Sequence, residues 1–100
     1  MQRLLLAEDV FDKLPDKNVT IRLGRKNIQL GKLEFESLEK KRKRVVTVFN
    51  VHYCKFGNIY IGDIINDGFY NHSDLYEGLK RFYPNLTWDS EMTTVKFKCI

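Results

Sequence analysis

Lys17-Asn18-Val19-Thr20-Ile21-Arg22-Leu23 is the most informative stretch of this 100-residue chain. Its apolar residues alternate as a pleated strand requires, and they are Val19, Ile21 and Leu23. The same alternation places Thr20 and Arg22 together on the opposite face. In a straight strand Lys17 and Thr20 would lie about 10 Å apart on opposite faces, so they meet only if the chain turns at residues 16–18. We therefore predict a strand with a candidate site at its start.

Composition predicts a single soluble domain spanning residues 1–100. Hydrophobic residues make up 43% of the chain and charged residues 30%, which is ordinary for a globular protein. No apolar run approaches the roughly 20 residues of a membrane span. Residues 4–6 are all leucine but lead directly into Glu8 and Asp9, unlike a secretory signal. We expect a cytoplasmic protein without membrane contact.

Cysteine and histidine positions give no indication of a metal site. Cys54 and Cys99 lie far apart without metal-ligand spacing, and His52 and His72 form no cluster with them. We expect both thiols to pack as small hydrophobic residues, and we expect neither a metal nor another cofactor.

The net charge of +4 is concentrated in one run, residues 40–44. That run consists entirely of basic residues: Lys40, Lys41, Arg42, Lys43 and Arg44. A near-neutral body with one basic protrusion favours a polyanionic partner. A solvated hairpin tip and a nuclear localisation signal have the same sequence pattern and remain open alternatives.

Periodicity predicts the remaining elements. Residues 5–14 have apolar residues at helical spacing and should form a short amphipathic helix closed by Pro15, which begins a turn. A tight connection at 24–27 should lead to a strand over 28–35, with a bulge or bend at Gly31. Residues 45–53 have the highest strand propensity, with apolar residues on both faces, so both should be covered.

The C-terminal half predicts further strands and a second helix. After a break at Gly57, Ile59 and Ile61 resume a strand pattern, and residues 95–99 form a last strand with one wet face. A helix should begin at Ser73 as N-cap and bury a face formed by Leu75, Leu79 and Phe82. Gly78 inside it indicates a close neighbour. The sum is an α+β domain of antiparallel strands curled into a small barrel, with two short helices.

Three features predict a candidate catalytic group: Lys17, Thr20 and Asp67, the last in the loop 64–69. A threonine hydroxyl is too weakly acidic to attack unaided, and a lysine amine with a lowered pKa can accept its proton. Arg22 and Arg25 would help to lower that pKa, and a carboxylate would orient the amine while opposing the shift. Each of these residues is, by itself, also common in a purely structural role.

The motif Lys17-x-x-Thr20-x-Arg22 resembles the opening motif of the ASCH domain, a small β-barrel family related to the PUA RNA-binding fold. The likeness extends over the chain, through Gly31, the Asp67-Gly68-Phe69 loop before the second helix, Tyr83-Pro84 and the closing Lys96-Phe97-Lys98-Cys99. The chain is most similar to the small bacterial branch of 4-acetylcytidine amidohydrolases. The resemblance implies five to six mostly antiparallel strands with two short helices.

The resemblance also implies residue roles. In the amidohydrolase branch the motif lysine and threonine, here Lys17 and Thr20, are catalytic, and a glutamate takes the position matched by Asp67. Aspartate is one methylene shorter, which would open the contact by about 1 Å unless the loop moves inward, and such misplacement slows catalysis about a hundredfold. Arg22 and the pair Arg25-Lys26 match residues proposed to hold phosphate or base.

Two main readings follow. The first is an RNA- or nucleotide-binding module whose cleft, lined by Lys17, Thr20, Arg22 and Asp67, holds a base. Candidate stacking residues are Tyr53, Phe56, Phe69 and Tyr70. The second is an amidohydrolase with Thr20 as nucleophile, Lys17 as base and Asp67 as orienting group. A ribonuclease and an inactive interaction domain are further alternatives. We expect a monomer whose partner is RNA or a modified nucleoside.

Overall fold

The computed structural model describes residues 1–14 and 16–99. Pro15, at which the sequence predicts the end of a helix and a turn, lies outside the described residues. The elements follow in the order β1 Gln2–Leu6, α1 Glu8–Phe11, β2 Val19–Leu23, β3 Gly31–Ser37, β4 Lys43–Lys55, the 3-10 helix η1 Phe56–Asn58, α2 Ile61–Asn66, α3 His72–Lys80 and β5 Glu91–Cys99. None of the helices in these residues is long and apolar enough to cross a membrane.

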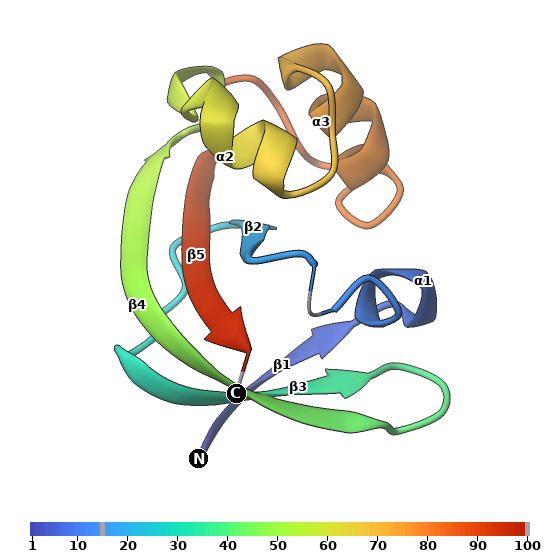
Figure 1. Ribbon diagram of the computed structural model, residues 1–100. Coiled ribbons are helices and arrows are strands. Elements are labelled where there is room, and N and C mark those ends of the chain that lie inside the picture. The colour runs from blue at the N-terminus through green and yellow to red at the C-terminus, as the bar shows by residue number, and fades with distance from the viewer. Residues whose placement is uncertain (15, 100) are drawn as a thin grey trace.

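One sheet of five strands carries the fold, in the order β1-β3-β4-β5-β2 (Figure 1). The strand β1 pairs with β3 in parallel, and the other three pairs are antiparallel. The sheet curves into a half-barrel, with α2 and α3 together at one end and α1 beside the end of β1. The predicted small α+β barrel of five to six mostly antiparallel strands is therefore confirmed, with five strands.

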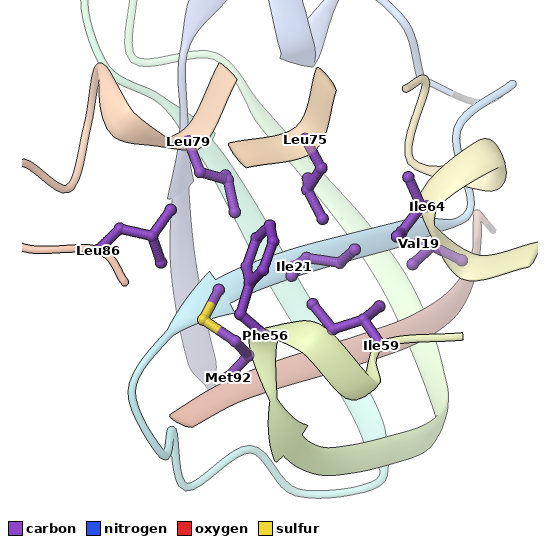
Figure 2. Close-up of a cluster of buried hydrophobic side chains, with 9 residues drawn as sticks. All are labelled: Val19, Ile21, Phe56, Ile59, Ile64, Leu75, Leu79, Leu86 and Met92. Atoms are coloured by element: carbon purple, nitrogen blue, oxygen red, sulfur yellow. The ribbon is translucent and has the colours of Figure 1, made fainter. Parts of the chain in front are cut away.

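Two hydrophobic clusters lie on the two faces of the curved sheet. One packs beneath α2 and α3 and centres on Phe56, which lies between α3 and β2 (Figure 2). The other fills the hollow of the half-barrel and includes Phe35 and Phe97, whose rings meet edge to face at 4.9 Å. The strand β5 serves both, because Met92 joins the first cluster and Phe97 the second. The sequence predicts that one face of this last strand is exposed to solvent, and on that face only Lys98, near the end of the strand, is exposed.

The prediction of one helix over residues 5–14 is wrong at its start. Residues 2–6 form β1, and the helix α1 is only Glu8–Phe11. Three consecutive leucines hide the alternation of the strand, in which Leu5 is 47% exposed and Leu6 only 4%. Parallel pairing with β3 fixes this strand, and a pairing between distant segments leaves no local pattern in the sequence.

Three expectations about the middle strands are also wrong. The segment after β2 is not a tight connection. β2 pairs with β5, and the strands β5 and β4 lie between β2 and β3 in the sheet, so the chain must cross from one to the other. Gly31, with φ +105°, begins β3, whereas the irregularity in the ladder falls in β4 between Val48 and Asn50. One face of β4 is open, since Phe49 is 48% exposed and its neighbour Thr47 is also exposed.

Residues 61–66 form the helix α2, where the sequence predicts a resumed strand at Ile59 and Ile61. The next helix, α3, begins at His72, and its N-cap is Asn71, not Ser73; the Asn71 side chain accepts a hydrogen bond from the Asp74 backbone N–H. The close neighbour expected at Gly78 is confirmed: a Cβ there would lie 2.5 Å from Cε1 of Phe69. The predicted third member of the buried face, Phe82, lies beyond α3 and is 48% exposed.

Candidate functional site

A cavity of about 300 Å³ opens between the end of β1, α1, β2 and the turn from α2 to α3. Four polar residues that the sequence singles out line it: Lys17, Thr20, Arg22 and Asp67. Its remaining wall is mainly aliphatic and aromatic. Cavities of this size that combine an apolar wall with a few converging polar groups are typical ligand sites.

Lys17 and Asp67 form a buried ion pair in this cavity. The Nζ of Lys17 contacts Oδ1 of Asp67 and lies 3.3 Å from the backbone oxygen of the same residue. Both side chains are nearly inaccessible, 9% exposed for Lys17 and 3% for Asp67. Because the backbone of Asp67 also reaches the amine, the loop approaches closely enough for the shorter aspartate side chain to make the contact.

The end of α2 positions Asp67, and the sequence predicts a plain loop there. Asp67 is the C-cap, and Gly68 follows with φ +100°, a conformation that favours glycine. The amides of Gly68 and Phe69 donate to the carbonyls of Ile65 and Ile64, at 3.0 and 3.1 Å. These two bonds define a Schellman motif, which ends the helix and fixes the direction of the chain. The Asp-Gly-Phe sequence is therefore a helix stop that also orients the carboxylate.

Thr20 and Arg22 lie on the cavity face of β2, as strand alternation predicts. The Nε of Arg22 donates to Oγ1 of Thr20 at 3.2 Å, and its Nη2 donates to the Leu5 carbonyl at 2.8 Å. Arg22 thus bridges β1 and β2, the two edges of the sheet, across the mouth of the half-barrel. Between the described residues Lys17 and Thr20 there is no direct hydrogen bond, although both line the same cavity.

Burial dominates the electrostatics of the site. It lowers the pKa of Lys17 to about 7, and the positive charges of Arg22 and Lys13 act in the same direction. Asp9 opposes this shift, and the ionised carboxylate of Asp67 opposes it by the same physical rule. Burial also lowers the pKa of Arg22, against the opposing effect of Tyr83, but a guanidinium stays charged at any physiological pH. Lys17 can therefore change its charge near neutral pH.

Of the four predicted stacking residues, only Phe69 lines the cavity, where it packs against Gly78. The prediction for Phe56 is wrong, because this ring is completely buried in the core cluster and offers no face to a ligand. Tyr70 is 86% exposed outside the cavity. Tyr53 lies on β4, outside the cavity, with the guanidinium of Arg25 4.0 Å from its ring centre.

The predicted phosphate-binding residues separate into three places. Arg22 is in the cavity. Arg25 and Lys26 follow the opposite end of β2, where Arg25 pairs with Glu91 at 3.3 Å and the Lys26 carbonyl accepts from the Tyr53 hydroxyl at 2.7 Å. This pair does not line the cavity.

The basic run forms the hairpin between β3 and β4. Lys40 and Lys41 occupy its tip, and Lys43 and Arg44 begin β4. Arg42 is not free for a ligand in this arrangement, because it bonds Glu8 at 3.0 Å and Asp12 at 2.7 Å. Its role is to hold α1 against the hairpin.

Sequence reasoning missed several residues of the cavity. The Leu5 carbonyl receives Arg22, and Lys13 and Arg81 line the mouth. No local pattern identifies them, since they come from three elements that only the curved sheet brings together. Among residues 1–14 and 16–99, no group of three or more His, Cys, Asp or Glu could hold a metal ion. Cys54 and Cys99 are half-buried and pack against different core clusters.

Comparison with known proteins identifies the fold. No protein-family model matches the sequence, and no curated protein matches it. Among solved structures, it is similar to the high-resolution crystal structure of an ASCH domain from Lactobacillus crispatus JV V101, with a TM-score of 0.70 at 13% identity. The match covers 95% of this chain and 79% of that chain. The chain therefore has the fold of an ASCH domain, which its sequence motifs predict.

Proposed function

We propose that the cavity binds the base of a nucleoside or of an RNA strand. The observation that carries this proposal is the convergence of Lys17, Thr20, Arg22 and Asp67 on one cavity of about 300 Å³. An ammonium, a carboxylate and a hydroxyl offer both donors and acceptors to the edge of a base, and the apolar wall offers contact to its faces. RNA-binding proteins commonly take up an unstacked base in this way. The ASCH fold is consistent with RNA binding.

Calorimetric titration with cytidine, uridine, adenosine and a short single-stranded RNA tests the proposal. Thr20→Val removes the hydroxyl while keeping the side-chain volume, and Thr47→Val is the matched control on the exposed face of β4. We expect Thr20→Val to weaken binding about tenfold, because a buried polar partner is left unpaired, and Thr47→Val to change nothing. Affinity for RNA should fall steeply with salt. Absence of binding to every ligand, or RNA binding that is insensitive to salt, would contradict the proposal.

A second candidate function is hydrolysis of an acylated base, of the 4-acetylcytidine type. It is favoured by the Lys17–Asp67 contact together with the pKa of Lys17 near 7, which suits a general base at neutral pH. In this reaction the neutral amine of Lys17 takes the proton of Thr20 as Oγ attacks the acetamide carbon. Asp67 holds the resulting ammonium, which passes its proton to the leaving nitrogen as the C–N bond breaks. Water, deprotonated by the same amine, then attacks the acetyl-threonine ester, and as the acyl C–O bond breaks the ammonium of Lys17 returns its proton to Oγ of Thr20 and acetate leaves.

Arg22 supports this candidate because it donates to Oγ1 of Thr20, so that charge developing on that oxygen meets a fixed cation. Substrate must bring Lys17 and Thr20 into direct contact, as catalytic hydrogen bonds often tighten only in the bound complex. To test the reaction, the protein is incubated with 4-acetylcytidine and the release of cytidine and acetate is measured by chromatography. Thr20→Ala should abolish release, Thr20→Ser should keep part of it, and Thr47→Ala should be fully active. A fully active Thr20→Ala variant would eliminate the mechanism.

The other readings have weaker support. The residues lining the cavity include no histidine; His52 is exposed on β4, and His72 bonds the Ile59 carbonyl at 2.8 Å. A histidine-based ribonuclease therefore has no candidate base here. An interaction domain with an inactive pocket is the conclusion to draw if neither binding nor hydrolysis is found.

A further inference from the structure

The walls of the cavity carry more positive than negative charge. Its charged lining residues are Asp9, Lys13, Lys17, Arg22, Asp67 and Arg81. Lys17 and Asp67 pair with each other, which leaves three cations facing one carboxylate. A neutral nucleoside would leave this excess uncompensated, so the charge indicates an anionic ligand.

The other acidic residues of the first helical segment do not neutralise this excess. Glu8 and Asp12 both bond Arg42, on the side of α1 that faces the β3–β4 hairpin. Neither lines the cavity. Arg42 therefore holds two carboxylates away from the mouth, and Asp9 is left as the acid on that wall.

Lys13 and Arg81 approach the mouth from different elements. Lys13 lies in the turn after α1, and Arg81 is the C-cap of α3. Both are exposed, and neither makes a salt bridge with any described residue. Lys13 lies close enough to Lys17 for its charge to affect the pKa of that amine. Arg81 lies beside Phe82, with its guanidinium carbon 5.0 Å from the ring centre, and its Nε donates to the Gly78 carbonyl at 3.4 Å.

We propose that the ligand of this cavity carries a phosphate, held at the mouth by Lys13 and Arg81 while the base lies between Thr20 and Asp67. This inference rests on the proposed base-binding function and specifies its ligand class as a nucleotide, free or within an RNA strand. An ammonium and a guanidinium on separate walls match the two-sided contacts that phosphates commonly receive, with the guanidinium able to bond two oxygens at once. Arg22, half-buried between the sheet edges, remains with Thr20 and the Leu5 carbonyl.

Equilibrium binding of cytidine, cytidine 5′-monophosphate, inorganic phosphate and a capped trinucleotide RNA tests the inference, because it requires no catalysis. At low salt we expect the monophosphate to bind about tenfold more tightly than cytidine, with the advantage shrinking as salt screens it. Lys13→Gln and Arg81→Gln should each reduce this ratio several-fold. Lys32→Gln, an exposed lysine on β3 outside the cavity, is the matched control and should keep it. The trinucleotide tells whether the phosphate can belong to a strand or must be terminal.

The two proposals fail in different ways. If cytidine and its monophosphate bind equally, or if Lys13→Gln and Arg81→Gln leave their ratio unchanged, the phosphate subsite is refuted while base binding stands. If inorganic phosphate binds as tightly as the monophosphate, the base contributes nothing and the proposed base-binding function is refuted. If nothing binds, both are refuted. Circular dichroism and thermal unfolding of each variant establish that it is folded.

Discussion

The pKa of Lys17 predicts a specific dependence of stability on pH. Burial lowers this pKa to about 7 in the folded protein, whereas an exposed lysine in the unfolded chain titrates near 10.4. Between these values the unfolded state binds the extra proton, so the free energy of unfolding rises with pH. Integrated from pH 7.0 to 8.5, one such group contributes about 1.5 kcal/mol. Below pH 7 both states are protonated, and the dependence due to Lys17 levels off.

Urea unfolding at pH 7.0, 7.5, 8.0 and 8.5 measures this directly. The probe is Trp88 fluorescence, because the indole stacks on Tyr76 with ring centres 5.6 Å apart. The variant Lys17→Met keeps the aliphatic stem and removes the titration, so its curve should lack the rise. Cys54 has a raised pKa and acts in the opposite sense, lowering stability as its thiol ionises in the unfolded chain above its ordinary pKa. That effect is common to both proteins and cancels in their difference.

A flat difference between wild type and Lys17→Met would refute the reasoning. It would mean that the carboxylate of Asp67 keeps Lys17 protonated, as its contact with Nζ allows. The amine could then not accept the proton of Thr20 at neutral pH, and the hydrolase mechanism would lose its base. Base binding would not be affected, because an ion pair can still donate and accept hydrogen bonds.

Three further predictions concern the frame of the site. Gly78→Ala should lower stability by about 1–2 kcal/mol in urea unfolding, because the new Cβ would lie 2.5 Å from Phe69 and the strain exceeds the gain in helix propensity; unchanged stability would mean that Phe69 is not held there. Gly68→Ala should cost about 1 kcal/mol in the same assay, because φ is +100° at the end of α2, and a neutral result would contradict the Schellman geometry. Phe56→Ala should cost about 3–5 kcal/mol, whereas Tyr70→Ala, at an 86% exposed position, should stay within about 0.5 kcal/mol of wild type; similar effects of the two would refute the assignment of Phe56 to the core.

Short-range pattern accounts for the elements that the sequence predicts. Alternating apolar residues predict the strand at Val19–Leu23 and the last strand over residues 95–99, and the structure has both, the last one extended to Glu91–Cys99. The side of β2 that carries Thr20 and Arg22 follows from the same alternation, because a pleated strand has only two faces. The glycine at position 78 also indicates its neighbour, since a missing side chain in a helix usually makes room for another one.

Tertiary structure decides the remainder, for identifiable reasons. The residues of β1 have no alternation to detect because all three leucines are alike. The isoleucines of α2 favour a strand until the packing of Ile64 into the cluster around Phe56 selects the helix. Phe56 begins η1 and Phe69 lies in the turn between α2 and α3, and only the placement of the helices buries the first ring and turns the second to the cavity. Lys13 and Arg81 lie 68 positions apart in the sequence. Both line the mouth of the cavity because the curved sheet brings its two edge strands, and with them the ends of α1 and α3, close together. Such proximity between distant segments depends on the path of the whole chain.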